Sequence, residues 1–212
     1  MPEKTTANAA LPGRPAARAL VLASTSPYRR ALLARLGLPF VSVAPVADET
    51  PLPGEAPAAT ALRLAECKAR SVAGAHPAAL IIGSDQVADC DGEPIGKPGS
   101  HDGAVAQLGR LSGRTIVFHT GLALLDARTG QCQTALVDVR STFRPLGPAE
   151  IDAYLRREQP YDCAGSVKSE ALGIALFRRI ESDDPTALVG LPLIRLTDML
   201  LAAGVGVLAP AG

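Results

Sequence analysis

The sequence predicts an α/β protein with a mixed β-sheet, and three of its features support this prediction. Short apolar runs of strand length, such as 79–84, alternate with stretches that carry apolar residues at helical spacing. Two longer strand-like runs, 115–125 and 131–143, are separated only by a short turn, which is typical of an antiparallel hairpin. Helices are predicted before, between and after these strands, so we expect them to flank a sheet of mixed direction.

The first half of the chain begins with a strand and a capped helix. The apolar run 19–23 leads to Ser26, which is suited to cap a helix, and to Pro27, which is favoured at the first helical position. The other elements expected here are a strand at 40–44, a helix from Pro57 to about Ala75 with Leu62, Ala65 and Ala69 on one face, the strand at 79–84 and a tight turn at Asp91–Gly92.

The second half repeats this pattern of capped helices and apolar strands. Ser100 is expected to cap a helix whose apolar face carries Val105, Leu108 and Leu111. Pro148 marks the start of another helix, because the first helical turn does not need the amide hydrogen that proline lacks. The elements expected after the hairpin are a helix at 148–157, a loop at 160–170, a strand at 174–180 and a last helix at 192–203.

Composition disfavours several classes of protein. The 212 residues contain 21 basic and 21 acidic side chains, and this balance disfavours a general nucleic-acid binder, whose affinity comes from many phosphate contacts. Aromatic residues make up only 3% of the chain, without tryptophan, so stacking platforms for single strands are not expected. No apolar run reaches the roughly 20 residues that a membrane span requires, so no membrane partner is expected.

The chain is expected to be a cytoplasmic protein with one main domain. Its four cysteines form no Cys-x-x-Cys pair and, without a signal peptide, are expected to be reduced thiols. Residues 1–17 are rich in alanine and proline and are interpreted as a flexible N-terminal extension. Residues 18–208 are then expected to form a single domain, or two closely joined lobes.

The start of the helix at Pro27 has the composition of an anion site. Free amide hydrogens and the helix dipole make this end positive, so cations in the first turn normally reduce stability. Here Arg29 and Arg30 lie in that turn, directly after the hydroxyls of Ser24–Ser26. Hydroxyls, amides and guanidinium groups together form a phosphate cradle, so we predict phosphate binding at this turn. Taken alone, the two arginines are equally well explained as solvated surface charges.

Two acidic segments are candidates for the chemistry. Asp85 follows the apolar strand at 79–84 and is therefore expected at the strand's carboxyl end, where α/β proteins bind ligands. An isolated aspartate at such a place is as often a turn or capping residue. Asp48 and Glu49 lie in a proline-rich loop. Because carboxylates repel a triphosphate, we expect a divalent cation between the acids and the phosphates.

Two lysines extend the predicted anion pocket. Lys97 lies between Gly96 and Pro98, which restrict its backbone, so a lysine aimed at phosphate is expected there. This segment is not a Walker loop, because only three residues separate its two glycines and a proline replaces the serine or threonine that binds magnesium. Lys68 lies on the helix that begins at Pro57, where an ordinary solvated charge is the simpler interpretation.

Taken together, these segments resemble the Maf family of nucleotide pyrophosphatases, which is related in fold to the ITPase-like house-cleaning enzymes. The resemblance extends from about residue 19 to residue 204 and implies an elongated, twisted mixed sheet with two lobes and a central cleft. The motifs that carry it are Ala-Ser-x-Ser-Pro-x-Arg at 23–29, Asp-Glu at 48–49, Leu-Ala-x-x-Lys-Ala at 64–69, Gly-Ser-Asp-Gln at 83–86, Gly-Lys-Pro at 96–98, Leu-Ser-Gly at 111–113 and Gly-Leu-Pro-Leu at 190–193.

The resemblance implies hydrolysis of a nucleoside triphosphate to the monophosphate and pyrophosphate, with a divalent metal cation such as Mg²⁺ or Mn²⁺. Stabilisation of the leaving pyrophosphate by positioned cations is consistent with that chemistry. The roles that it implies by position are phosphate binding for Ser24 and Arg29, charge neutralisation for Lys68 and Lys97, metal binding for Glu49, and general base, metal ligand or both for Asp85.

Three positions resemble the YceF-type branch of the family, which acts on 7-methyl-GTP. Tyr28 and Gln86 stand where members that prefer dTTP and UTP carry arginine and threonine, and Glu170 lies in a segment that also differs from theirs. N7-methylation makes guanine cationic, so it would gain from the face of Tyr28 and from the carboxylate of Glu170. Tyr28 replaces the tryptophan expected in this branch, so stacking is expected to be weaker.

Two other functions are consistent with the same resemblance. One is a dTTP/UTP pyrophosphatase of the same family, and the other is a nucleotide-binding regulator of cell division or septum formation that does not turn over its ligand. In each case the partner is a small-molecule nucleotide, and the resemblance also makes a homodimer an expectation.

Overall fold

The computed structural model describes residues 18–208 and confirms the predicted α/β class. The N-terminal extension predicted at 1–17 lies outside the described residues. The strands are β1 (Leu20–Ala23), β2 (Phe40–Val43), β3 (Leu80–Cys90), β4 (Glu93–Ile95), β5 (Thr115–Asp126), β6 (Cys132–Phe143) and β7 (Phe177–Glu181). The helices are α1 (Pro27–Ala34), α2 (Pro57–Ser71), α3 (His101–Leu111), α4 (Pro148–Glu158) and α5 (Leu193–Ala202).

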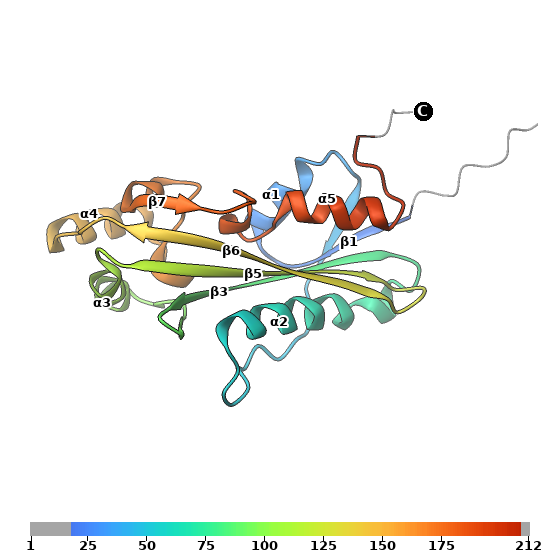
Figure 1. The fold of residues 1–212 in the computed structure, drawn as a ribbon, viewed down its shortest axis with the longest axis horizontal. Coiled ribbons are helices and arrows are strands. Elements are labelled where there is room, and N and C mark those ends of the chain that lie inside the picture. Colours follow the sequence, from blue (N-terminus) through green and yellow to red (C-terminus); the bar gives the residue numbers. More distant parts are fainter. Residues whose placement is uncertain (1–17, 209–212) are drawn as a thin grey trace, which may run out of the picture.

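The strands form one mixed sheet in the order β2-β1-β3-β5-β6-β7, and β4 pairs with β3. β1 pairs in parallel with β2 and β3, whereas the remaining pairs are antiparallel. The predicted hairpin is confirmed as β5 and β6. Figure 1 shows that β3, β5 and β6 are long enough to run through most of the molecule.

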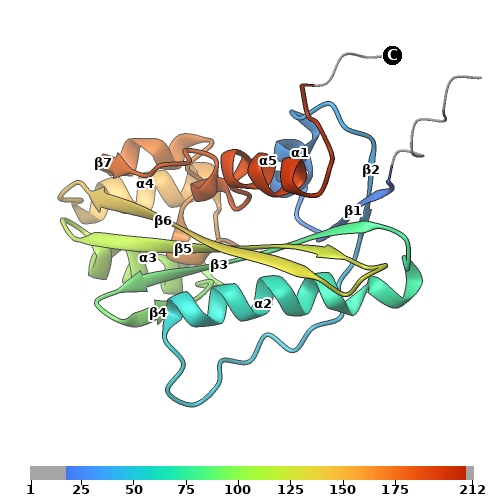
Figure 2. The same cartoon turned by 45° about the vertical axis from the view of Figure 1, so that its right-hand side comes forward.

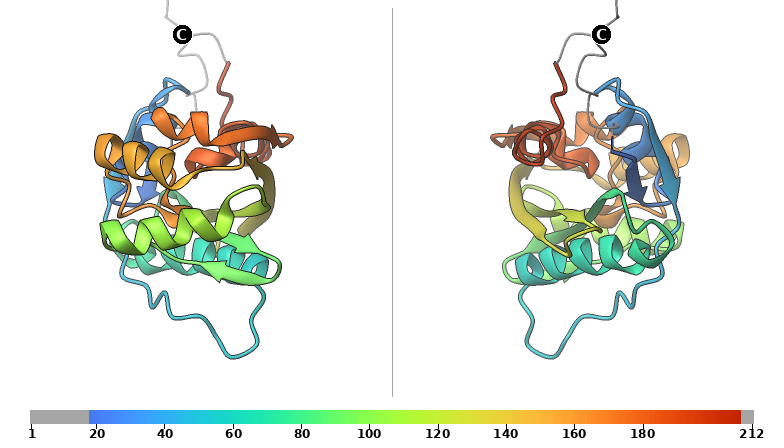
Figure 3. Two further views of the ribbon diagram at one scale, coloured as in Figure 1. Left: turned by 90° about the vertical axis from the view of Figure 1, so that its left-hand side faces the viewer. Right: turned by 90° about the vertical axis from the view of Figure 1, so that its right-hand side faces the viewer.

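Helices cover both faces of the sheet. α2 lies along one face, and α1 and α5 lie together on the other, as Figure 2 shows. The views along the long axis in Figure 3 show the sheet between these two groups. None of the helices within residues 18–208 combines the length and the apolar character that crossing a lipid bilayer requires.

Separate clusters of buried side chains give the molecule two closely joined lobes. One cluster joins α1 and α5 to β1 and to the first part of β3, and a smaller one lies under α2. Another cluster packs α3 and α4 against the far ends of β3, β5 and β6. Because β3 and β5 contribute side chains to both lobes, the strands themselves connect them.

β3 is longer than the sequence predicts, and this places Asp85 differently from the expectation. The predicted strand ended at Ser84, but β3 continues to Cys90. Its parallel pairing with β1 ends at Ile82, whereas its antiparallel pairing with β5 continues to Asp89. Asp85 therefore lies inside a strand, just beyond the point where β1 leaves the sheet. The prediction of a strand end was wrong, because the apolar run marks only the part of β3 that is buried on both faces.

The buried faces of two helices differ from the prediction. In α3, Val105 is 36% exposed, whereas Ala104 is buried together with the predicted Leu108 and Leu111. In α2, Leu62 is only half-buried, and Leu64 is in the core. Alanines occupy part of both buried faces, and their small side chains contribute little to the apolar pattern from which such a face is predicted.

Two further differences concern short strands. Residues 172–176 form a 3₁₀ turn, so the strand predicted from 174 begins at Phe177 as β7. A short apolar run does not distinguish a tight turn from a strand. β4 was not predicted, because its central residue is Pro94, and proline is disfavoured in strands other than edge strands.

α2 packs closely against the sheet because two glycines lie beneath it. A Cβ atom at Gly83 of β3 would lie 2.0 Å from the carbonyl oxygen of Ala65, and one at Gly121 of β5 would lie 2.2 Å from that of Ala61. Gly83 and Gly121 are nearly opposite each other in the β3–β5 ladder, where Asp85 pairs with Gly121. The close approach brings Lys68 of α2 to Asp85 of β3.

Candidate active site

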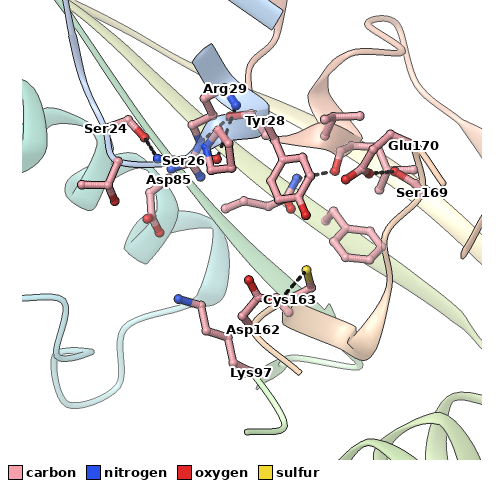
Figure 4. Close-up of a pocket in the computed structure, with 18 of the residues that line it drawn as sticks. Ser24, Ser26, Tyr28, Arg29, Asp85, Lys97, Asp162, Cys163, Ser169 and Glu170 are labelled. Atoms are coloured by element: carbon pink, nitrogen blue, oxygen red, sulfur yellow. Dashed lines mark hydrogen bonds between the residues drawn. The ribbon is translucent and has the colours of Figure 1, made fainter. Parts of the chain in front are cut away.

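A cavity of about 520 Å³ opens beside the first turn of α1, where β1 leaves the sheet (Figure 4). This volume lies within the usual range for small-molecule sites. Segments that are far apart in the sequence line it, from Ala23 to Gly190. The structure brings all nine predicted site residues to this cavity: Ser24, Tyr28, Arg29, Glu49, Lys68, Asp85, Gln86, Lys97 and Glu170.

The turn between β1 and α1 has the predicted capped geometry. Ser26 has extended backbone angles, and its side chain accepts a hydrogen bond from the Arg29 amide at 3.3 Å. The Ser24 hydroxyl accepts one from the Ser26 amide at 3.1 Å. The Ser24 hydroxyl hydrogen is therefore left to donate to a ligand. No acidic residue lies in the first turn of α1, so its positive end is not neutralised locally.

Arg29 is held in place by a backbone carbonyl. Its Nε donates to the Gly190 oxygen at 2.8 Å, which leaves the two terminal nitrogens without an acceptor among residues 18–208. Burial lowers the pKa of the guanidinium, and the nearby charges of Asp85 and Glu49 oppose this shift. Arg30 is exposed and does not line the cavity, so the prediction that both arginines contribute to the cradle was wrong for Arg30.

Lys68 bridges the two predicted acidic centres. Its Nζ lies 2.6 Å from Glu49 Oε1 and 2.6 Å from Asp85 Oδ1. The Lys68 side chain is only 8% exposed, so the interpretation as an ordinary solvated helix charge was wrong. The hydrogen bond from Lys68 holds the pKa of Glu49 below its ordinary value, so this carboxylate is ionised at neutral pH. Asp48, by contrast, caps Thr50 in the exposed loop and does not line the cavity.

The two carboxylates are suited to a hard divalent cation that a ligand helps to hold. Glu49 and Asp85 each use one oxygen for Lys68, and their other oxygens have no partner among residues 18–208. In the same part of the chain, no group of three or more acidic, histidine or cysteine side chains is arranged to hold a metal. Mg²⁺ is commonly bound by one or two carboxylates together with substrate phosphates and water, so these residues fit such an ion.

Gln86 presents a defined polar atom to the cavity. Its Nε2 lies 2.9 and 3.2 Å from the carbonyl oxygens of Ala187 and Leu188, and 3.0 Å from the Thr120 hydroxyl oxygen. Carbonyl oxygens only accept hydrogen bonds, so the amide group of Gln86 must face them. The Oε1 atom, an acceptor, is therefore the part of the side chain left for a ligand.

The far part of the cavity differs in character from the phosphate cradle. The lining includes the aromatic rings of Tyr28 and Phe118 and the carboxylate of Glu170. Figure 4 shows Tyr28 between the cradle side, with Ser24 and Asp85, and the side that carries Glu170 and Ser169. Lys97 is exposed at the cavity's edge, away from Glu170. One end of the cavity therefore combines cations with hydroxyls, and the other combines aromatic side chains with a carboxylate.

Two supporting residues were not identified as functional from the sequence. The fully buried Ser84 hydroxyl lies 2.9 Å from the Gly190 oxygen and 2.9 Å from the Gly121 oxygen. Ser84 therefore links the Gly190 carbonyl, which is the group that orients Arg29, to the sheet. The sequence did contain a signal, because Ser84 and Gly190 both lie in motifs that carried the family resemblance. No feature of either segment of the sequence indicated that these two motifs lie close together in the structure.

A comparison with known families matches residues 19–203 to the family described as Maf-like protein. This chain belongs to that family. Among curated proteins it is similar to the 7-methyl-GTP pyrophosphatase of Cupriavidus metallidurans, with 61% identity over 88% of this chain and 94% of the relative. It is similar to proteins of the same name from Thiobacillus denitrificans, with 62% identity over 89% and 94%, and from Polaromonas, with 60% over 93% and 90%.

Proposed function

We propose that this Maf-like protein hydrolyses 7-methyl-GTP to 7-methyl-GMP and pyrophosphate, and so removes a modified nucleotide. The observation that carries the proposal is the division of one cavity into a cationic end and an aromatic, acidic end. A nucleotide with a cationic base and an anionic tail has the same division of charge. The names of the relatives described above agree with this substrate.

In the proposed complex the triphosphate lies at the first turn of α1. Ser24 and the free amides of α1 donate hydrogen bonds to phosphate oxygens, and the terminal nitrogens of Arg29 pair with them. Lys97 approaches from the edge of the cavity as a point charge. These donors stabilise the negative charge that moves onto the leaving pyrophosphate when water attacks the α-phosphorus and the bond to the bridging oxygen breaks.

Glu49 and Asp85 are the proposed ligands of a divalent cation. Such an ion, when bound, would neutralise phosphate charge and polarise the phosphorus centre. Asp85 is the proposed residue that accepts the proton of the attacking water, acts as a metal ligand, or does both. Lys68 holds the two carboxylates close together, because it donates to each at 2.6 Å.

The methylated guanine is proposed to lie against Tyr28. A cation over an aromatic face gains about 0.5–2 kcal/mol, more when water is excluded. Glu170 then accepts hydrogen bonds from the N1–H and amino group of guanine. The Gln86 Oε1 is a further acceptor for a hydrogen on the base or the ribose.

A nucleotide panel tests the substrate. Purified protein is assayed for pyrophosphate release from 7-methyl-GTP, GTP, dTTP and UTP, with Mg²⁺ or Mn²⁺ and with EDTA. We expect the highest kcat/KM for 7-methyl-GTP and loss of activity in EDTA. A preference for dTTP or UTP would overturn the assignment of Tyr28, Gln86 and Glu170, and undiminished activity in EDTA would overturn the metal.

The Asp85→Asn variant tests the catalytic role and separates an enzyme from a nucleotide-binding regulator. We expect a loss of kcat of at least about a hundred-fold, because the amide neither accepts the water proton nor binds a cation as a carboxylate does. Binding of 7-methyl-GTP, measured by calorimetry, should be retained. Unchanged pyrophosphate release by Asp85→Asn would show that this residue has no part in the mechanism. If the wild-type protein binds 7-methyl-GTP but does not hydrolyse it, the function as a nucleotide-binding regulator is favoured.

We also propose that residues 18–208 form one catalytic domain that acts in the cytoplasm on free nucleotides, not on nucleic acid. The family match over 19–203 and the zero net charge support this. A homodimer is proposed from the family resemblance. Sedimentation equilibrium with the full chain tests the dimer, and salt-dependent binding of duplex DNA would contradict the exclusion of nucleic acid.

A further inference from the structure

Asp162 is a carboxylate of the cavity wall that none of the sequence motifs singled out. It immediately precedes Cys163 and lines the cavity together with Tyr28 and Glu170. Figure 4 shows Glu170 and Asp162 apart from each other, Glu170 beside the ring of Tyr28 and Asp162 below that ring, where it is drawn next to Cys163 and Lys97. Two carboxylates therefore lie on different parts of the cavity wall around Tyr28.

These two carboxylates differ from the other acids of the cavity because no cation pairs with them. Glu49 and Asp85 share the ammonium group of Lys68. Within residues 18–208, Asp162 and Glu170 form no ion pair, and their contacts are with the Cys163 thiol at 3.5 Å and the Ser169 hydroxyl at 3.4 Å. Lys168 lies nearby in the sequence, but its Nζ donates to the Glu158 carbonyl at 3.0 Å. The base end thus has an excess of negative charge.

The pKa of Tyr28 supports the view that both carboxylates act on the same space. Burial raises this pKa above its ordinary value, and the charge of Lys168 opposes the rise. Cys163, Glu170 and Asp162 each raise it further. The charges of both carboxylates therefore act at the ring of Tyr28, against which the base is proposed to lie.

We propose that Asp162 is a second specificity residue, which acts with Glu170 to recognise the positive charge of an N7-methylated guanine ring. This inference rests on the proposed function. A neutral guanine needs only one carboxylate to accept from its N1–H and amino group, and a second unpaired carboxylate improves binding only when the base itself is cationic. Asp162 thus favours the methylated nucleotide over GTP, whereas Glu170 contributes to the binding of both.

Binding of 7-methyl-GMP and GMP by the full-length protein tests this without turnover. The two monophosphates have the same tail, so the ratio of their Kd values, measured by calorimetry, reports recognition of the base charge alone. For Asp162→Asn we expect this ratio to fall about five-fold, with GMP binding unchanged, because one exposed charge contributes modestly. Asp162→Glu should keep most of the preference. Asp198→Asn, on α5 and outside the cavity lining, removes the same charge and should change nothing.

Salt provides a second measurement. The preference of the wild type for 7-methyl-GMP should weaken between about 50 and 500 mM NaCl, because exposed charges are screened. The preference of Asp162→Asn should depend less on salt. An unchanged Kd ratio in Asp162→Asn would overturn the proposal. An equal loss of affinity for 7-methyl-GMP and GMP would also overturn the proposal, because Asp162 would then act on Lys97 or on phosphate binding and not on the charge of the base.

Failure of the proposed function would look different from failure of this inference. If the wild type binds UMP or dTMP more tightly than 7-methyl-GMP, the substrate is wrong, whatever Asp162→Asn does. If the wild type prefers 7-methyl-GMP and Asp162→Asn keeps that preference, the substrate stands and Asp162 has no part in selecting it. Thermal unfolding of each variant shows that it is folded before its Kd values are compared.

Discussion

At the scale of single residues, the charge of the site depends on Lys68. Its ammonium group is nearly buried and contacts one oxygen of each acid. Without it, two carboxylates would face each other beside a cavity that we propose to bind a triphosphate. The pair between Lys68 and Asp85 is buried, and it is important mainly because removal of one partner leaves the other charge uncompensated.

The Lys68→Met variant should therefore lose both stability and activity. We expect the free energy of unfolding to fall by about 3 kcal/mol, because the Asp85 carboxylate stays buried without its partner. Urea denaturation measures this change. Arg70→Met is the matched control on the same helix, since Arg70 forms an exposed pair with Glu66, and it should cost less than about 0.5 kcal/mol. Equal losses in the two variants would contradict this reasoning.

Gly190 is the second residue whose identity is fixed by its surroundings. Its φ of +107° is unfavourable for other residues, and a Cβ there would lie 3.2 Å from Arg29 Nε. Gly190→Ala should reduce stability by about 1–3 kcal/mol and also raise KM, because Arg29 must move.

Gly204→Ala separates these two effects. Gly204 also has a positive φ, of +80°, but no atom lies within 4 Å of the position that a Cβ would occupy there. This variant should lose stability and keep the wild-type KM. A normal KM in Gly190→Ala would show that the contact with Arg29 does not matter for binding.

At the scale of elements, the position of α2 on the sheet decides where the acids and the lysine meet. Gly83 and Gly121 let the helix backbone touch the strands, with no room for a Cβ at either place. Lys68 lies between Ala65 and Ala69, the helix residues that cover Gly83, so any outward shift of α2 also moves its ammonium group.

Gly83→Ala should consequently affect folding and catalysis together. Its Cβ would meet the Ala65 oxygen at 2.0 Å, so α2 must move, and we expect a loss of about 3 kcal/mol or more with a large fall in kcat. Gly109→Ala is the control, because Gly109 lies inside α3 with open space around it. That variant should be stabilised by about 0.5–1 kcal/mol. Thermal unfolding and pyrophosphate release distinguish the two outcomes.

At the scale of the whole molecule, ion pairs between distant segments make stability depend on acidic pH. Arg18 donates to both oxygens of Asp126, at 2.6 and 2.5 Å, and joins the start of β1 to the end of β5. These hydrogen bonds lower the pKa of Asp126 to about 2, and Arg63 does the same for Glu55. The stabilisation is complete above the ordinary pKa of these groups and is lost as the pH falls toward 2.

The melting temperature should therefore fall steeply between about pH 4 and pH 2. In Asp126→Asn the fall should be shallower, because one of the carboxyls that gain protons on unfolding is gone. Asp198→Asn, whose pair with Arg195 is long at 3.7 Å, should follow the wild-type curve. Parallel curves for all three proteins would show that the Arg18–Asp126 pair does not contribute.

The sequence by itself determined the elements and the chemical inventory of the site. Capping residues, proline positions and apolar periodicity are local signals, so they predicted the start of α1, and they predicted the hairpin and α5 within a residue or two. The family resemblance predicted nine of the residues that line the cavity, because such a resemblance already contains information about three-dimensional proximity.

Only the tertiary structure decided how these residues act on one another. The burial of Lys68, the orientation of Gln86 and the anchoring of Arg29 by Gly190 depend on contacts between segments separated by up to 161 residues. The unpaired charge of Asp162 likewise depends on where Lys168 is directed. Such contacts have no local pattern, because a side chain's partners are set by how helices and strands pack and not by its neighbours along the chain.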